Sequence, residues 1–125
     1  MKSTAIVIPT LGNPLNKAWI KSMSSTIKVI VVCDGDDDVV IEGVTRIFSN
    51  RRGFSGAVNV GIRQAQQEGH QSVLVLNDDA IPEPGCIEAL ISAYAPEMGL
   101  LSPVIVENDR VVWGYKRSRW GRFRY

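Results

Sequence analysis

The sequence predicts a three-layer α/β/α protein in which helices cover both faces of a mostly parallel sheet. Apolar runs alternate along the chain with segments whose apolar residues recur at helical spacing, in the order β-α-β-β-α-β-α-β-β. The run Val73–Leu76 consists of large aliphatic residues, which is typical of a strand buried on both faces of a parallel sheet. A chain of 125 residues is long enough for a single domain with its own core.

The N-terminal part of the chain predicts a strand, a helix and a second strand. Ala5–Ile8 is a continuous apolar run and gives the first strand. A helix is predicted over residues 14–24, with Asn13 as its N-cap and Pro14 at its first position, where proline loses no hydrogen bond. Ile27–Val32 is rich in β-branched residues and predicts the second strand.

The middle of the chain predicts a short strand followed by a long helix. Val44–Phe48 is the predicted strand, and a polar loop that contains glycine, residues 49–56, follows it. The helix is expected to end at Gly69, because glycine is common just after a helix C-terminus. The apolar residues that recur at helical spacing along it are Phe54, Val58, Ile62 and Ala65.

The last predicted elements follow the strand at residues 73–76. Pro82–Gly85 begins a helix that carries apolar residues on one face as far as Tyr94. Leu100–Val106 and Arg110–Trp113 predict two strands joined by a polar turn at residues 107–109.

The composition is that of a globular protein, with 45% hydrophobic and 22% charged residues. No apolar run approaches the roughly 20 residues that cross a bilayer, and the N-terminus predicts a strand rather than a signal peptide. Cys33 and Cys86 lie far apart in apolar contexts, which favours buried free thiols in a reducing compartment over a disulfide. We therefore expect a cytoplasmic protein.

The net charge of +1 hides an asymmetry along the chain. Residues 116–125 carry five basic side chains and no acid, interleaved with aromatic residues, and the remainder of the chain has a net charge of −4. We predict a domain at residues 1–115 followed by this basic aromatic tail. The tail could fold over a diphosphate, bind nucleic acid through phosphate contacts and stacking, touch an anionic membrane, or be a disordered terminus.

Polar loops follow the first four predicted strands and should meet at one edge of the sheet. The carboxyl ends of parallel strands connected by right-handed crossovers lie together, and ligands bind in the crevice outside them. These loops are residues 9–13, 33–38, 50–56 and 77–82. One crevice would thus hold an acid after the second strand, Arg51 and Arg52 after the third, and two acids after the fourth.

The two acids, Asp78 and Asp79, follow Asn77 directly after the strand at residues 73–76. If the chain stays extended, Asn77 and Asp79 point to one side and Asp78 to the other. Asp79 is then the predicted metal contact, for manganese or magnesium (Mn2+ or Mg2+) together with substrate phosphates, and Asp78 the contact to a sugar or ribose hydroxyl. An early turn would reverse this assignment.

Other residues complete the candidate site. Asp34 ends the second strand, where carboxylates in doubly wound folds contact nucleoside hydroxyls or base edges, and Arg51 and Arg52 suit diphosphate oxygens. Asn59 is predicted to make either a packing hydrogen bond or a nucleotide contact. His70 lies in a polar turn and is expected to have a surface role, so no serine or cysteine triad is assembled. No G-x-G-x-x-G follows the first strand, which disfavours a nicotinamide cofactor.

Taken together, these motifs resemble family 2 glycosyltransferases of the GT-A fold over residues 4–106. The segments that carry the resemblance are Ile6–Thr10, Val31–Gly35, Arg52–Ile62, Leu76–Gly85 and Met98–Pro103. The resemblance implies a minimal GT-A fold that binds a nucleotide diphosphate sugar, with Asn77 in place of the first aspartate of the D-x-D motif and Asp79 as the second. The nucleotide-sugar contacts that it implies are Pro9, Thr10, Asp34, Arg52, Asn59, Asn77 and Asp78, with Asp79 on the metal.

The resemblance also implies transfer of a hexose from a donor such as a UDP-sugar to an unidentified acceptor, with inversion at the anomeric carbon. Family members usually have a second half that binds the acceptor and carries the carboxylate base. In this chain only Glu107 and Asp109 remain after the last recognisable strand, so the catalytic residue stays unassigned. The alternatives are a minimal enzyme, a partner or second subunit that supplies the missing parts, and a non-catalytic module that binds nucleotide sugars or nucleic acid.

Overall fold

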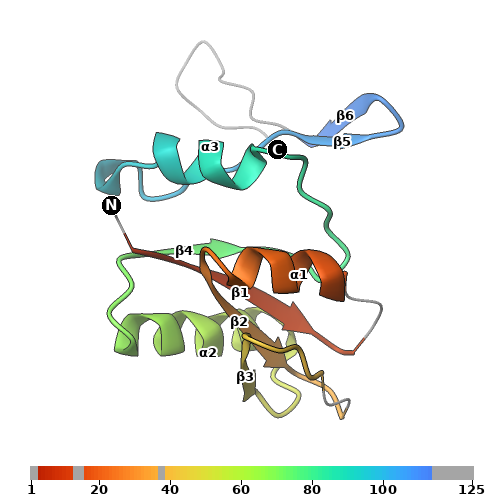
Figure 1. Ribbon diagram of the computed structural model, residues 1–125, viewed down its shortest axis with the longest axis vertical. Helices are drawn as coiled ribbons and strands as arrows, with labels where there is room; N and C mark the ends of the chain where they lie inside the picture. The colour runs from red at the N-terminus through yellow and green to blue at the C-terminus, as the bar shows by residue number, and fades with distance from the viewer. Residues whose placement is uncertain (1–2, 13–15, 37–38, 114–125) are drawn as a thin grey trace. The chain divides into compact units, whose positions relative to one another are not determined.

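The structure is a computed structural model that describes residues 3–12, 16–36 and 39–113. The chain divides into two units, Met1–Ile81 and Pro82–Tyr125, and each is described by itself. The element order, β-α-β-β-α-β-α-β-β with one added 3-10 turn, is the predicted one (Figure 1). The predicted boundary at residue 115 and the tail at 116–125 lie outside the described residues.

The N-terminal unit is built on a parallel four-stranded sheet in the order β3-β2-β1-β4. Its strands are β1 (Thr4–Thr10), β2 (Lys28–Cys33), β3 (Thr45–Phe48) and β4 (Ser72–Val75). Thr10 pairs with Cys33, and Cys33 with Phe48, so three strands end level with one another. Because β4 stops beside Val7, the residues that follow it run along the end of β1.

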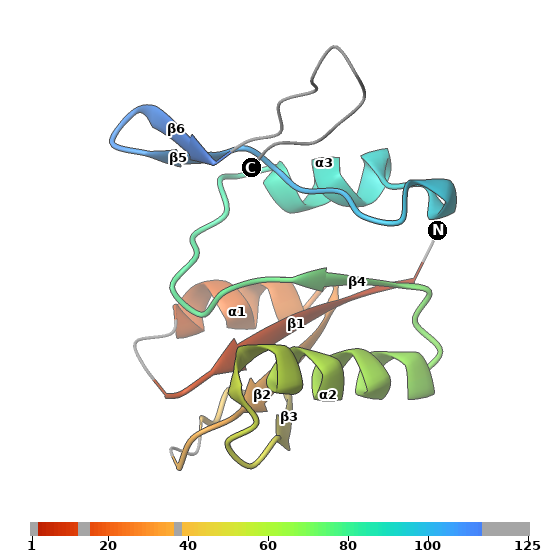
Figure 2. The ribbon, with the colours of Figure 1, turned by 180° about the vertical axis from the view of Figure 1, so that it is seen from behind.

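Helices α1 (Lys17–Ser24) and α2 (Gly53–Gln67) cover opposite faces of this sheet. Helix α1 lies on the near side in Figure 1, and α2 lies on the near side when the molecule is seen from behind in Figure 2. The predicted three-layer arrangement is thus present in this unit. Helix α1 is capped by Asn16, whose Oδ1 accepts from the backbone N–H of Trp19 at 3.1 Å. The helix therefore begins at Lys17, and the expected cap Asn13 lies outside the described residues.

The core lies around the two inner strands. All the apolar residues of β1 from Ala5 to Ile8 and of β2 from Val29 to Cys33 are buried. Helix α2 packs on them through Ala57, Gly61 and Ala65 rather than through the larger residues of the predicted apolar series, of which Ile62 is exposed. A Cβ added at Gly61 would lie 2.3 Å from Cγ1 of Val7, so the small side chains allow the helix backbone to approach the sheet closely.

Strand β4 is less buried than its sequence predicts. Val73 and Leu74 are half-buried and Val75 is 39% exposed. Among the described residues β4 has one strand neighbour, β1, and Gly61 on the buried stripe of α2 packs over β1 and β2. Strand β4 therefore lies at the margin of the covered area, and the expectation of a strand buried on both faces is wrong. Its apolar sequence still matches the parallel pairing that the prediction required.

The C-terminal unit contains helix α3 (Cys86–Ala93), the 3-10 turn Pro96–Met98 and an antiparallel hairpin of β5 (Ile105–Glu107) and β6 (Arg110–Trp113). The hairpin turn has φ values of 49° at Asn108 and 59° at Asp109. Positive φ at both central residues is the geometry of a two-residue type I′ turn, in which Asn and Asp are favoured. The predicted polar turn is confirmed, whereas β5 is shorter than the expected strand 100–106.

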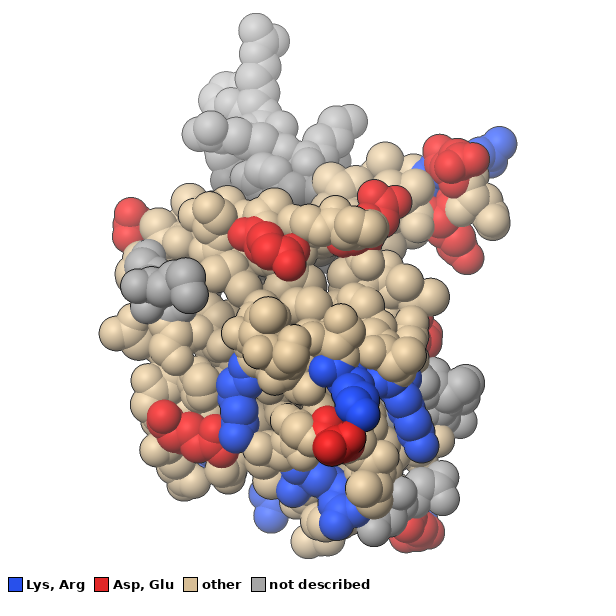
Figure 3. Space-filling view, in the orientation of Figure 1, with Lys and Arg blue, Asp and Glu red and all other residues tan. Residues whose placement is uncertain are grey.

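Charges divide unevenly between the units. Lys and Arg side chains gather on the N-terminal unit in Figure 3, whereas the charges on the described part of the C-terminal unit are mostly acidic. Both cysteines are free; Cys33 is buried in β2 as expected, whereas Cys86 is only half-buried. In the described part of the chain no helix combines the length and the apolar character that crossing a membrane requires.

Candidate functional site

A cavity of about 370 Å³ opens at the carboxyl edge of the parallel sheet, within the N-terminal unit. All four loops that were predicted to meet contribute to it, because their strands run in the same direction. The residues that line it are Pro9, Thr10, Leu11, Asp34, Gly53, Phe54, Ala57, Asn77, Asp78 and Asp79. Of the predicted site residues, the side chains of Arg52 and Asn59 are not among them.

Asp34 is the buried anion of the site. Its Oδ1 accepts hydrogen bonds from the hydroxyl of Ser49 and, at 2.8 Å, from the N–H of Arg52; its Oδ2 accepts from the N–H of Gly53 at 2.9 Å. The Ser49 hydroxyl is the main reason that the pKa of the Asp34 carboxyl lies below its ordinary value, and the two backbone N–H groups lower it further. The carboxylate is therefore ionised at neutral pH.

The loop that surrounds Asp34 has an unusual backbone. Asn50 and Arg51 both have φ of 57°, and Gly53 has φ of 76° after a right-handed Arg52. A right-handed residue followed by a left-handed one points successive N–H groups at a common centre and forms an anion-binding nest. Here the anion is the chain's own Asp34. The N–H groups of Arg52 and Gly53 are thus occupied within the chain, and with three bonds accepted Asp34 keeps about one lone pair for a ligand.

The two arginines of this loop lie outside the cavity lining. Arg51 forms an ion pair with Asp36 on the exposed side of the loop. The stem of Arg52 lies against α2, where a Cβ added at Gly56 would be 2.4 Å from the Cβ of Arg52. Gly56 therefore leaves room for that stem. Asn59 is exposed on α2. The predicted ligand contacts of Arg52 and Asn59 stay predictions.

The segment after β4 turns earlier than an extended strand would. The N–H of Leu76 donates to the carbonyl of Val7 at 3.0 Å, and the N–H of Ala80 donates to the carbonyl of Asn77 at 3.2 Å. This second bond closes a β-turn over residues 77–80. The extended chain that the predicted alternation required is therefore absent, the early turn that was the alternative is present, and all three residues line the cavity.

Thr10 fixes the position of Asp78. The Thr10 hydroxyl donates to Oδ2 of Asp78 at 2.9 Å and accepts from the N–H of Gly12 at 3.0 Å. Thr10 is 4% exposed, and its hydroxyl is already occupied in both directions. Its predicted role at the nucleoside is thus joined by an observed one, which is to hold Asp78 at the cavity wall. Pro9 precedes it on β1 and contributes apolar surface to the same wall.

The oxygen donors of the cavity suit a divalent cation that is shared with a substrate. Among the described residues no group of three or more His, Cys, Asp or Glu side chains is placed to hold a metal ion. The cavity does offer the carboxylates of Asp78 and Asp79 and the amide of Asn77. Mg²⁺ and similar hard cations are commonly held by one or two carboxylates plus substrate phosphates and water. The donor set fits that arrangement rather than an all-protein cage.

Three residues that sequence reasoning did not select belong to this site. Ser49 is 2% exposed and donates to Asp34, and Leu11 and Phe54 present large apolar side chains to the cavity. A polar residue at the end of a strand gives no sign of burial in the sequence. Phe54 did carry a signal, since it opens the apolar series of the central helix.

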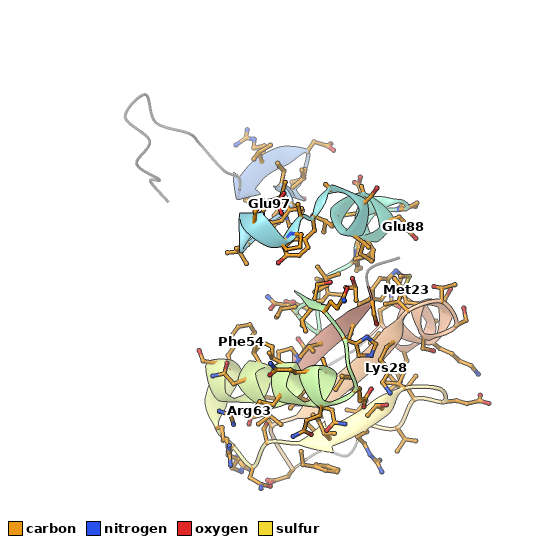
Figure 4. The ribbon with its side chains drawn as sticks, turned by 90° about the vertical axis from the view of Figure 1, so that its left-hand side faces the viewer. Met23, Lys28, Phe54, Arg63, Glu88 and Glu97 are labelled. Atoms are coloured by element: carbon orange, nitrogen blue, oxygen red, sulfur yellow. The ribbon has the colours of Figure 1, made fainter. Side chains whose placement is uncertain are left out.

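His70 lies near the opposite end of the sheet. Its Nδ1 is 2.6 Å from Oγ of Ser3, and its Nε2 is 3.8 Å from Oε2 of Glu68. Glu68 also pairs with Lys28 at 2.9 Å, where β2 begins (Figure 4 labels Lys28). The His70 side chain is 14% exposed, so it is more covered than a polar turn suggests, and it is not among the residues that line the cavity.

One comparison with known proteins identifies a family for this chain. A family model described as Glycosyl transferase family 2 matches residues 19–125, which is most of the chain. No curated protein and no solved structure gives a match. The matched region includes the loop around Asp34, the start of α2 and the turn at residues 77–80, whereas Pro9 and Thr10 precede it.

Proposed function

Because the chain belongs to glycosyl transferase family 2, we propose that its cavity binds the nucleotide diphosphate portion of a sugar donor. The family has the GT-A fold, and transfer of a glycosyl group is its general reaction. The observation that carries the proposal is the convergence of the Asp34 loop and the turn at residues 77–80 on one cavity at the carboxyl edge of the sheet.

The proposed donor binds with its diphosphate toward the turn at residues 77–80. The turn removes the extended geometry on which the choice of Asp79 first rested, but the Thr10 hydroxyl already holds Asp78, so Asp79 remains the proposed metal contact. Asp79, aided by Asp78 and Asn77, would hold Mn²⁺ or Mg²⁺ there, and such a cation supplies charge neutralisation for a diphosphate leaving group. Thr10 keeps Asp78 in place through its 2.9 Å hydrogen bond. Asp34 holds the loop that begins α2, and its remaining lone pair is available to a nucleoside hydroxyl or base edge.

The transferred group that we propose is a hexose, with inversion at the anomeric carbon, and the proposed location is the cytoplasm. The acceptor site and the general base would come from outside the cavity. Three described carboxylates line the cavity. Asp34 accepts hydrogen bonds from the loop before α2, Asp78 accepts one from Thr10, and Asp79 is the proposed ligand of the cation. The same observation favours a second candidate, a donor-binding module that needs a partner or second subunit for turnover.

Calorimetry with UDP, GDP and dTDP, each with and without Mn²⁺, tests the proposal. We expect binding of at least one nucleotide to require the cation, and Asp79→Ala to weaken it at least about tenfold, equivalent to about 1.4 kcal/mol. Glu42→Ala is the matched control, since Glu42 is an exposed acid paired with Lys21 away from the cavity. Absence of binding by every nucleotide diphosphate would refute the proposal.

Donor turnover separates the two candidates. An enzyme that is complete in this chain should release the nucleotide from its sugar donor when a suitable acceptor is present. A binding module should bind the same donor without turnover until a partner is added. Release of nucleotide by the purified chain would therefore exclude the module.

A further inference from the structure

Phe54 is a large apolar side chain left uncovered at the cavity. It is the second residue of α2, it lines the cavity, and it is 59% exposed (Figure 4). Single exposed apolar residues are common on protein surfaces. Phe54 differs from them because of its place on the helix and its neighbours in the cavity.

Phe54 lies on the stripe of α2 that faces the sheet. Ala57, Gly61 and Ala65 follow it three, seven and eleven residues later, which is the spacing of one helical face, and all three are buried. Gly61 packs over Val7 and Val32 in the middle of the sheet. Phe54 lies about one helical turn before Ala57, where the strands have ended, so at this position the same face of the helix borders the cavity.

The lining of the cavity combines apolar and polar residues. Its apolar side chains are those of Phe54, Pro9, Ala57 and Leu11, and Leu11 is itself 60% exposed. Its polar side chains are those of Thr10, Asp34 and the turn at residues 77–79. The phosphates and sugar hydroxyls of a nucleotide sugar need polar partners, whereas the nucleobase is planar and its face can cover an aromatic ring.

We propose that Phe54 is the stacking platform for the nucleobase of the donor and gives the site its preference for a nucleoside diphosphate over free pyrophosphate. This inference rests on the proposed function. Stacking on an aromatic side chain depends on the face that every base possesses, so it does not require hydrogen bonds to the base edge. That suits a site in which Asp34 has already accepted three hydrogen bonds from the chain.

The test compares UDP with inorganic pyrophosphate as calorimetric ligands, both in Mn²⁺, for the wild type, Phe54→Leu and Phe54→Trp. We expect Phe54→Leu to weaken UDP binding at least about tenfold and to leave pyrophosphate binding within about twofold of the wild type, because stacking involves only the base. Phe54→Trp should retain UDP binding. Phe48→Leu is the control, since Phe48 is 52% exposed but lies on β3 outside the cavity lining.

Two results would overturn the inference while leaving the proposed function intact. One is unchanged UDP affinity in Phe54→Leu; the other is an equal loss of UDP and pyrophosphate binding. A wild type that binds no nucleotide diphosphate would overturn both. If Phe54→Leu does not fold, Phe54→Trp provides the test. UDP should quench the fluorescence of the introduced tryptophan, because the base stacks on it, and pyrophosphate should leave that fluorescence unchanged. No difference between the two ligands would count against stacking.

Discussion

The close packing of α2 on the sheet predicts that Gly61→Ala destabilises the protein. The added Cβ would lie 2.3 Å from Cγ1 of Val7 and 3.0 Å from Cγ2 of Val32. Val7 and Val32 are fully buried on the two inner strands, so neither side chain has room to move away. Overpacking of this kind costs about 1–3 kcal/mol, and replacing glycine by alanine in a helix returns up to about 1 kcal/mol. Because a 2.3 Å approach lies far inside van der Waals contact, the upper part of the overpacking range, about 2–3 kcal/mol, applies, and we expect a net loss of roughly 1–2 kcal/mol in the free energy of unfolding.

Urea denaturation followed by circular dichroism measures this loss, with Gln66→Ala, at an exposed position of the same helix, as the control for helix propensity. The double variant Val7→Ala with Gly61→Ala should lose less stability than the sum of the single variants, because removing the Val7 methyl groups relieves the contact. A Gly61→Ala protein as stable as the wild type, or additive losses in the double variant, would show that α2 does not lie this close to β1.

Three further expectations follow from the site. Asp34→Asn should lower the free energy of unfolding at pH 7, as measured by urea titration. The pKa of Asp34 is lower in the folded state than its ordinary value of 3.8, so the ionised carboxylate stabilises the fold at pH values above 3.8. This stabilisation is lost as the pH falls through the folded-state pKa, so the difference between wild type and variant should shrink below about pH 3.8. A deficit that is the same at pH 3 and pH 7 would contradict this. Thr10→Val should weaken Mn²⁺-dependent UDP binding less than Asp78→Ala does, and Thr10→Ser should restore it in calorimetry; a Thr10→Val protein with wild-type affinity would show that the tether is dispensable. Removal of residues 116–125 should abolish any salt-dependent mobility shift with DNA or RNA, and a shift that persists would place nucleic-acid binding elsewhere.

The parallel sheet and its crevice could be predicted because they depend on patterns that span many residues. Apolar runs such as Val29–Val32 require burial wherever they lie in the chain, and the alternation with helices then leaves few topologies. Once the strands are parallel, the loops after them must share one edge. Asp34 and Asp79 could therefore be assigned to the same cavity from sequence, although 45 positions separate them.

The errors arose where a single hydrogen bond or contact decides the local geometry. The choice between an extended chain and an early turn at residues 77–79 is decided by one hydrogen bond, from the N–H of Ala80 to the carbonyl of Asn77, which closes the turn. The buried face of α2 was misjudged because Gly61 and the small residues beside it permit a close approach that larger apolar residues would prevent. Neither effect has a periodic signature in the sequence.

The anion-binding nest at the start of α2 is a further feature that the sequence did not reveal, and it changes which groups of the site could bind a phosphate. A glycine-bearing loop before a helix suggests a phosphate site, since helix N-termini bind anions. In this chain the N–H groups of Arg52 and Gly53 donate to Asp34 instead. These two N–H groups are therefore not available to a bound phosphate, and at the oxygen-rich turn at residues 77–79 the proposed diphosphate would need a cation between itself and the carboxylates.

The interactions of the three cavity carboxylates limit which of them could act as the general base. Asp34 anchors a loop, Asp78 accepts from Thr10, and Asp79 is the one for which the described residues provide no hydrogen bond. A general base must be able to take a proton from the acceptor, whereas a carboxylate bound to a cation loses much of its basicity. If Asp79 holds the cation, the base has to come from outside this cavity. A donor that binds tightly to this chain yet turns over only when a second protein or a second copy is added is the behaviour expected from that division of roles.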